Sequence, residues 1–267
     1  MPISPGTHVV YTVHAGDSLF TIANQFGTSV SALVQANALY PPITEPDLIF
    51  PGQKILVRMP GMSQQSAVLH QVTEGDTMYG LAERYSVGLE LLAALNQMQR
   101  PDILRVAQLV YIPAFVYEVE QGDSVFRISR RFGLPISELA RANQNRPGFS
   151  PDLVYPGFRL IVPLPASTNL AVLQPLPGTR IAAGQPLSGI ARAFDATMFY
   201  QIRDAADHVV TRERAFMTAA GAPAFGPFHV SIQLDETPTT PTGTLMVYIR
   251  SARDGSIQDL VEVAVAF

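Results

Sequence analysis

The chain has 267 residues, of which 18 are basic and 22 acidic, and only 15% of its residues are charged. This near balance excludes the broad basic face that a nucleic-acid or anionic-membrane partner requires, so we expect neither. The sequence contains no cysteine, which excludes disulfides and thiol-based metal sites, and no tryptophan, so any aromatic platform for a ligand must be Tyr or Phe.

The first residues, Met1 to Gly6, show neither the basic start nor the apolar core of a secretion signal. No apolar run in the sequence approaches the ~20 residues that cross a bilayer as a helix. We therefore expect no signal peptide in this chain and no membrane span.

A Gly-Asp pair followed 21 residues after its glycine by Asn occurs three times along the next part of the chain. The pairs begin at Gly16, Gly75 and Gly122, and the asparagines are Asn37, Asn96 and Asn143. A Pro-Asp follows each asparagine after a variable gap, and Pro-Gly then appears in the first and third copies, at Pro51-Gly52 and Pro156-Gly157. A fixed period with one variable gap indicates a repeated folded unit with one tolerant loop.

Each repeat predicts a β-α-α-β unit. An apolar-alternating stretch precedes each Gly-Asp pair, and apolar residues recur behind it at helical spacing. Asp and Ser or Thr offer helix N-cap oxygens, and a second short helix is predicted to begin near Ser29, Gly88 or Pro135. The closing strands are expected at 54–57, 109–112 and 159–162.

Beyond residue 170 the sequence changes to short strand candidates separated by turns. These candidates are 191–194, 198–203, 228–234, 245–249 and an alternating run from Val261 to Phe267, with a hairpin signal at Asp254-Gly255. About seven short strands in a region of this size suggest an immunoglobulin-like sandwich. The predicted fold class is therefore α+β multidomain, with three small βααβ units followed by a β-sandwich.

The repeats resemble the LysM domain, a glycan-binding module of bacteria and eukaryotes. Segments 11–19, 33–37 and 50–55 carry the resemblance in the first copy, and the middle copy diverges, with Val106-Ala107 in place of Pro-Gly. The last region resembles the immunoglobulin-like domain of bacterial spore-germination proteins, at Pro177-Gly178, 187–191, 194–195, 243–245 and 251–255. The domain map that follows is 8–58 (unit 1), 59–67 (linker), 68–113 (unit 2), 115–163 (unit 3), 164–170 (linker) and 171–267 (sandwich).

The LysM resemblance implies a groove between the turn after the first strand and the loop before the last, which recognises N-acetylglucosamine units of peptidoglycan or chitin. In the first unit it assigns Asp17, Ser18, Leu19, Phe20, Asp47, Leu48, Ile49 and Phe50 to this groove. In the second it assigns Thr77, Met78, Tyr79, Ile103 and Leu104, and in the third Asp123, Ser124, Val125, Phe126, Asp152, Leu153, Val154 and Tyr155.

Several of these residues also have a purely structural interpretation. Asp17 and Asp123 fit a turn and helix cap, while Leu19 and Val125 fit a core. The exposed or packed state of Phe20, Phe50, Phe126 and Tyr155 separates ligand contact from packing. The three asparagines are expected to tie a helix end to the variable loop, His14 and His70 to face solvent, and the missing Pro-Gly to change the exit of the middle loop.

No catalytic constellation is visible, because the five histidines are dispersed and form no metal-binding pair. We therefore expect a non-enzymatic, cofactor-free and metal-free protein that binds peptidoglycan or chitin-type glycan, with a protein partner for its last domain. The resemblances imply a location in the bacterial cell wall or spore envelope, reached from the mother-cell cytoplasm in the absence of a visible signal. Two alternatives remain: a targeting or regulatory subunit of a wall-lytic hydrolase, and a spore-coat assembly protein that binds no glycan.

Overall fold

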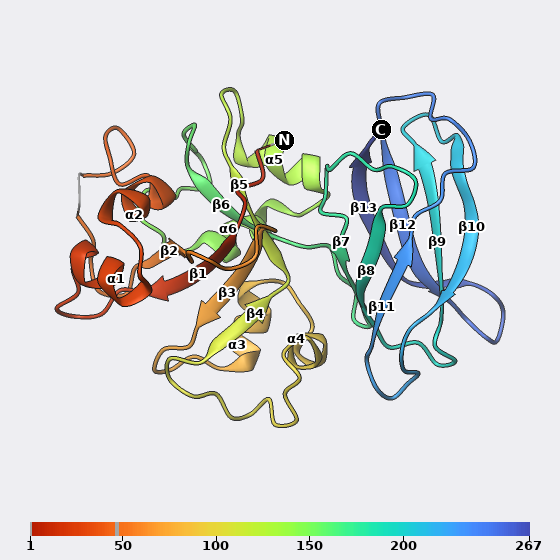
Figure 1. Ribbon diagram of the computed structural model, residues 1–267, viewed down its shortest axis with the longest axis horizontal. Helices are drawn as coiled ribbons and strands as arrows, with labels where there is room; N and C mark the ends of the chain where they lie inside the picture. Colours follow the sequence, from red (N-terminus) through yellow and green to blue (C-terminus); the bar gives the residue numbers. More distant parts are fainter. Residues whose placement is uncertain (1, 46–47) are drawn as a thin grey trace.

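The computed structural model describes residues 2–45 and 48–267, and it contains three small helix-and-strand units followed by a β-sandwich (Figure 1). The first unit consists of β1 (Thr7–Thr12), α1 (Leu19–Phe26), α2 (Val30–Asn37) and β2 (Lys54–Arg58). The second consists of β3 (Ala67–Gln71), α3 (Met78–Arg84), α4 (Leu89–Leu95) and β4 (Leu109–Ile112). The third consists of β5 (Ala114–Glu118), α5 (Val125–Phe132), α6 (Ile136–Asn143) and β6 (Arg159–Pro163). These elements confirm the predicted βααβ units.

Local sequence explains where the helices begin and end. The second helices start after Ser29, Gly88 and Pro135, as predicted, and the Ser29 hydroxyl accepts the backbone N–H of Ala32. The first helices are followed by Gly27, Ser86 and Gly133, which all take the left-handed backbone with φ of 63°, 54° and 68°. Glycine adopts this conformation without strain, and the middle unit adopts it with serine.

The first and second units share one sheet with the strand order β2-β1-β3-β4 (Figure 1). The central pair, β1 and β3, is parallel, with Val9 opposite Leu69 and Val10 opposite His70. The segment between the units is held in place as well, since Gly6 donates its N–H to Gln64 and Ser66 accepts the N–H of Val116. The two units therefore form one body, although the intervening residues read as a loose linker in the sequence.

The strands of the first and third units bury both faces. Val9 and Ile55 face the helices of their own unit, whereas Val10 and Leu56 enter a second hydrophobic cluster. That second cluster, which we call the shared core, also takes in most of the second unit's core and, from the third unit, Ala114, Val116, Ala142 and Ile161. Removing apolar side chains from water stabilises a fold in proportion to the buried area, so the shared core fixes the three units to one another.

Cationic side chains also cross the junction between the units. Arg84 of the second unit donates hydrogen bonds to the carbonyl oxygens of Ala142 (3.3 Å) and Gln144 (2.7 Å), at the carboxyl end of α6. Arg146 donates to the side chain of Asn143 (3.1 Å) at the same helix end and to the side chain of Asn37 in the first unit (3.5 Å). The helix dipole favours cations at this end. Burial and the nearby Arg84 charge lower the pKa of Arg146 to about 9.

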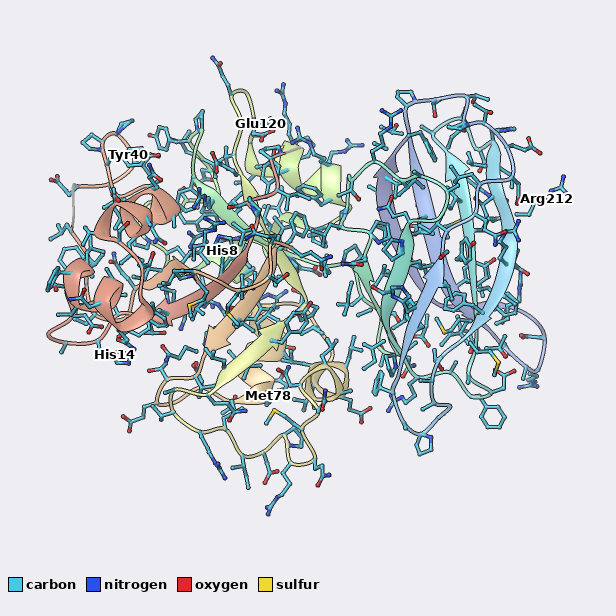
Figure 2. The ribbon with its side chains drawn as sticks, in the orientation of Figure 1. His8, His14, Tyr40, Met78, Glu120 and Arg212 are labelled. Atoms are coloured by element: carbon cyan, nitrogen blue, oxygen red, sulfur yellow. The ribbon has the colours of Figure 1, made fainter. Side chains whose placement is uncertain are left out.

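His8 lies at the centre of the three units (Figure 2) and is fully buried. Neither of its ring nitrogens has a hydrogen-bond partner among the described residues. Burial lowers the pKa of His8 to about 4, and repulsion from Arg159, Arg58 and Arg146 acts in the same direction. The imidazole is therefore neutral at pH 7.

The remaining strands are β7 (Leu170–Gln174), β8 (Pro186–Ala191), β9 (Thr197–Asp204), β10 (Val209–Met217), β11 (Gly226–Ser231), β12 (Thr242–Arg250) and β13 (Ile257–Ala266). They form two sheets, β10-β9-β12-β13 and β11-β8-β7, which pack face to face as the expected immunoglobulin-like sandwich (Figure 1). The prediction of a strand over 191–194 is wrong: the strand ends at Ala191, and Phe194 and Asp195 form a turn. Asp195 shapes this turn, since its carboxylate accepts the N–H of Thr197.

The sandwich is not isolated from the three units. Ala171 on β7 and Ile190 on β8, which are opposite each other in register, reach the shared core with their side chains. Arg192, just after β8, forms an ion pair of 2.6 Å with Glu90 at the start of α4. The outer face of the smaller sheet therefore packs on the array of units.

Candidate functional site

Each unit joins two loops at the end of its first strand. In the first unit, the N–H of Val13 donates to Gln53, and the N–H of Gly52 donates back to Val13, both at 2.8 Å. Val72 and Val119 make the same pair of 2.8 Å bonds with the corresponding loops of the second and third units. The turn after the first strand and the loop before the last strand therefore lie side by side in all three units.

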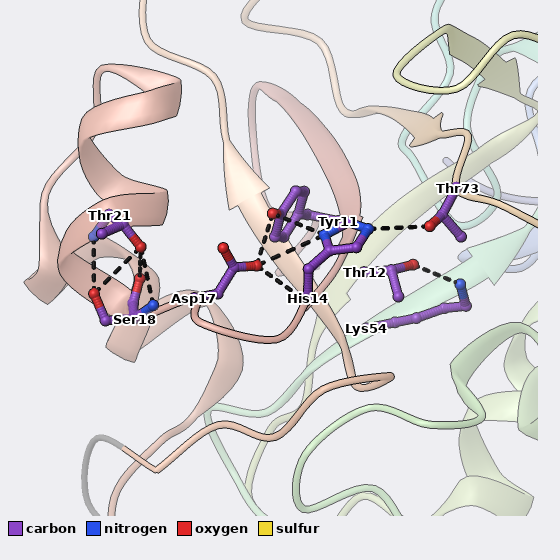
Figure 3. Close-up of polar contacts among 8 residues, drawn as sticks. All are labelled: Tyr11, Thr12, His14, Asp17, Ser18, Thr21, Lys54 and Thr73. Atoms are coloured by element: carbon purple, nitrogen blue, oxygen red, sulfur yellow. Dashed lines mark hydrogen bonds and ion pairs between the residues drawn. The ribbon is translucent and has the colours of Figure 1, made fainter.

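The aspartate of each Gly-Asp pair closes the turn. Asp17 accepts hydrogen bonds from the backbone N–H of His14 (2.7 Å) and from the hydroxyl of Tyr11 (2.8 Å), as Figure 3 shows. Burial and this carboxylate raise the pKa of Tyr11. Asp76 and Asp123 accept the equivalent backbone N–H groups, at 2.9 and 3.0 Å. The predicted N-cap role of the aspartates is therefore wrong, because their carboxylates hold the turn.

The helix N-caps are the residues that follow. Ser18 accepts the N–H of Thr21 (3.1 Å), and Thr21 accepts the N–H of Ser18 (2.9 Å), which completes a capping box (Figure 3). Thr77 and Ser124 cap α3 and α5 through their side chains alone, which accept the N–H groups of Gly80 and Arg127. Position and orientation of each first helix are thus fixed at the end that faces the paired loops.

The next two positions of each helix point in opposite directions. Leu19, Met78 and Val125 are buried in the cores of their units, so their assignment to a groove surface is corrected to a packing role. The aromatic side chains that follow, Phe20, Tyr79 and Phe126, are 67%, 64% and 55% exposed. Each unit therefore exposes one aromatic ring at the same position of its first helix.

The loop residues divide in the same way. Leu48, Phe50, Ile103 and Leu153 are exposed; Ile49, Leu104 and Tyr155 are half-buried; Val154 is buried; and Asp152 is exposed. Asp47 lies outside the described residues. Each loop therefore presents apolar side chains at the surface among its described residues.

The expected change in the exit of the middle loop is wrong. Ala107 takes the left-handed backbone with φ of 67°, close to the 86° of Gly52 and the 85° of Gly157. Its N–H also makes the same 2.8 Å bond, to Val72. The middle unit therefore keeps the backbone of the site, and differs by Arg105 at the position of Phe50 and Tyr155. The loop of this unit lines an open pocket of ≈ 630 Å³.

The conserved geometry extends to the asparagines. Asn37 donates to the carbonyl oxygens of Leu33 (2.9 Å) and Leu56 (2.8 Å), and its side-chain oxygen accepts the N–H of Leu56. Asn96 and Asn143 make equivalent bonds to β4 and β6. These amides therefore join the second helix to the closing strand, not to the variable loop as expected.

The two histidines near the turns differ. His14 is exposed and its Nε2 lies 3.1 Å from the hydroxyl of Thr73 in the second unit (Figure 3). His70, expected in solvent, is fully buried between the hydroxyl of Tyr85 (2.9 Å) and the carboxylate of Asp76 (3.0 Å). Burial lowers the pKa of His70. Tyr85 and Asp76 of its own unit therefore enclose this side chain.

Sequence reasoning missed the contribution of the variable loop of the first unit. Ile43 packs on the core of the third unit, and a Cβ at Gly157 would lie 3.1 Å from the hydroxyl of Tyr40. The signal in the sequence was the presence of apolar residues in the loop after Asn37, a loop whose length varies from one repeat to the next. Tyr40 therefore lies beside the exit loop of the third site.

Neither a metal-binding cluster nor a membrane-spanning helix is found in the described part of the chain. Residues 2–45 and 48–267 contain no cluster of His, Cys, Asp or Glu that could hold a metal ion. In the same residues, every helix is too short or too polar to cross a membrane. The arrangement instead offers backbone polar groups, exposed aromatic rings and apolar loop side chains.

The chain belongs to the LysM domain family, which it matches over residues 11–58, 70–113 and 117–163, together more than half of its length. Residues 169–256 match the immunoglobulin-like domain of bacterial spore germination. These matches confirm both resemblances proposed from the sequence. Three LysM units indicate glycan binding as the general class of function.

Individual proteins are similar over part of the chain. The secreted LysM effector ECP6 of Passalora fulva is 34% identical over 110 residues, which cover 41% of this chain and 47% of the effector. An autolysin of Enterococcus faecalis is 31% identical over 106 residues, covering 37% of this chain and 14% of the autolysin. The solved structure of the Bacillus cereus spore cortex-lytic enzyme SleL is 30% identical over 40% of this chain and 22% of that chain, with a TM-score of 0.29. The chain spans less than half the length of the curated relatives it matches.

Proposed function

We propose that this protein is a non-catalytic binder of N-acetylglucosamine-containing glycan, peptidoglycan or chitin-type, located in the bacterial cell wall or spore envelope. One observation carries the proposal: all three units expose an aromatic side chain at the same helical position, beside a loop held by the same two hydrogen bonds. A sugar ring offers an apolar face to such a side chain, and its N-acetyl amide pairs with backbone polar groups.

The described site residues divide into two roles under this proposal. Phe20, Phe50, Phe126 and Tyr155 contact the sugar faces, and Leu48 and Leu153 cover the acetyl methyl groups. Asp17 and Asp123 hold the turns that shape the site, since their carboxylates already accept several intramolecular hydrogen bonds. The middle unit, with Arg105 in place of an aromatic, binds more weakly.

Repetition has an energetic reason. A shallow and hydrated site binds one sugar segment weakly, whereas linked sites raise the overall avidity by ~10²–10⁴ where the geometry permits simultaneous engagement. A wall polymer that presents the same sugar many times is the ligand on which such linked sites act. The exposed aromatic residues favour this function over an assembly protein that binds no glycan, in which they would be packed.

Similarity to autolysins supports a second candidate, in which the chain targets or regulates a wall-lytic hydrolase. In that case the LysM array still binds glycan, and the sandwich carries the interaction with the enzyme. In both cases we propose a protein partner for the sandwich, in which β10 is an edge strand of the larger sheet.

Retention of the full chain on washed, insoluble peptidoglycan and chitin tests the proposal. We expect the wild-type chain to be retained, and Phe20→Ala combined with Phe126→Ala to be retained less. Phe194→Ala is the matched control, because Phe194 is 84% exposed on the sandwich and distant in sequence from every proposed site. Absence of retention of the wild-type chain on both polymers would contradict the proposal.

A further inference from the structure

The three LysM sites are fixed in space relative to one another. Parallel pairing of β1 with β3 joins the first two units, and the shared core includes side chains of all three. Further bonds cross the junction between the first and third units, where the N–H of Lys54 donates to Asn145 at 2.8 Å. Such contacts leave no flexible tether through which one site could turn toward another.

The fixed sites open on two sides of the array. Because β1 and β3 run parallel, the turns that follow them lie at the same end of the sheet, where His14 and Thr73 are hydrogen-bonded. The turn of the third unit begins at Glu120. Figure 2 shows His14 and Met78 along one side of the array and Glu120 on the opposite side. The exposed aromatics Phe20 and Phe126 belong to these two opposed sites.

We propose that the protein bridges two separate glycan strands, one held by the first unit and the other by the third. This inference rests on the proposed function and adds the geometry of its partner. A short oligosaccharide bound on one side of a rigid array does not extend around the array to the other side. Each short oligosaccharide therefore occupies one site, and both sites are engaged together only where several strands lie close, as in a polymer mesh.

The bridging geometry explains how weak sites on a rigid body gain avidity. Two sites on one face would hold one strand twice, whereas opposed sites hold neighbouring strands and resist their separation. The middle site lies on the same side of the array as the first site. Its weaker binding strengthens the hold on the strand at that side, and the array still has two opposed binding sides. The predicted behaviour is that of a cross-linker.

Mixing the full chain with long, soluble, peptide-free peptidoglycan glycan strands tests this inference by light scattering. We expect scattering to rise and then fall as protein is added, because excess protein saturates separate strands. Titration with the tetramer of N-acetylglucosamine should give a stoichiometry of about two strong sites for the wild type and about one when either site is removed. Phe20→Ala with Phe50→Ala removes the first site, and Phe126→Ala with Tyr155→Ala removes the third.

Each of these variants is made together with Tyr79→Ala, which removes the exposed aromatic of the weak middle site. Both should lose scattering while each still binds the tetramer, and Phe194→Ala should scatter like the wild type. Tetramer binding without scattering by the wild-type chain overturns the bridging inference and leaves the proposed function intact. Continued scattering by the single-site variants would show self-association instead and also overturns it. A wild-type chain that binds neither tetramer nor polymer refutes the proposed function, and the bridging inference with it.

Discussion

His14 of the first LysM unit shares a hydrogen bond of 3.1 Å with Thr73 of the second, which joins the turns of two neighbouring sites. The contact exists because β1 and β3 pair in parallel, with both turns at the same end of one sheet. Units that appear in the sequence as successive modules are therefore neighbours across a strand ladder. The rigidity of the array follows from this pairing and from the shared core.

Leu56→Ala should destabilise all three units together. Leu56 is fully buried in the shared core, and truncation of a buried leucine to alanine costs about 2–5 kcal/mol. Hydrogen exchange should show that amides of β5 in the third unit lose protection along with those of β1. Loss of protection confined to the first unit would contradict a shared core. Ile22→Ala, which truncates a residue facing only the first unit's own cluster, is the comparison.

Stability should fall as the pH is lowered from about 6.5 to about 4. His8 has a pKa lowered to about 4 by burial and by neighbouring arginines, whereas the unfolded chain binds its proton near 6.5. The unfolded state therefore binds more protons within this window, so acid favours unfolding, by roughly 3 kcal/mol at the low end. The contribution is fully present above pH 6.5.

Urea denaturation of the wild type and of His8→Leu at pH 4.5 and pH 7 measures this effect. The variant should lose less stability between the two pH values than the wild type does. Buried His70, whose pKa is also lowered, contributes in the same direction and should leave a residual dependence in the variant. An identical pH dependence in both proteins would show that His8 does not titrate in this way.

The sequence predicted the units well because their caps and turns are local. Ser29, Gly27 and the Gly-Asp pairs act on backbone within a few residues, and the repeat spacing revealed them. The shared core was not predicted, although Val9-Val10-Tyr11 is a continuous apolar run. Such a run indicates a strand buried on both faces, but it does not identify what covers the second face.

The sites were predicted only in part, because their backbone turns are local in sequence and the directions of their side chains are not. Resemblance assigned Phe20, Phe126, Leu19 and Val125 alike to the groove. The sequence left a core role open for Leu19 and Val125, which do point into the core, and it left Phe20 and Phe126 undecided between ligand contact and packing. The direction of the side chains at a helix start depends on the turn before the helix. The aspartates fix this turn because their carboxylates accept hydrogen bonds from residues several positions earlier in the chain. Tyr40 was missed because it reaches the third unit from the loop of the first, a tertiary contact without a local signal.

Arg105→Tyr should strengthen glycan binding by the middle unit. The backbone of this site already matches the others, since Ala107 makes the same bond to Val72 as Gly52 makes to Val13. An added aromatic contact contributes about 0.5–1.5 kcal/mol, which corresponds to a gain in affinity of roughly twofold to thirteenfold. The measurement is tetramer binding in a chain whose first and third sites are removed, with Arg105→Ala as the control. A gain in the alanine variant equal to that of the tyrosine variant would show that loss of charge is responsible.

The purified chain should release no soluble fragments from peptidoglycan. Its sequence lacks cysteine, and the described residues contain no metal-binding cluster of His or carboxylate groups. Incubation with insoluble peptidoglycan, followed by chromatography of the supernatant, measures any release. Soluble fragments that disappear after substitution of a single acidic residue or histidine would identify the chain as an enzyme.

Calorimetric titration of the full chain with the N-acetylglucosamine tetramer, comparing the wild type with Phe50→Ala combined with Tyr155→Ala, tests glycan binding most directly. The exposed and half-buried positions of these rings imply little loss of stability on truncation, which circular dichroism melting checks in parallel. The account predicts an intact fold and an affinity reduced by roughly twofold to thirteenfold at each site. An unchanged affinity in the folded double variant would contradict the assignment of the sites.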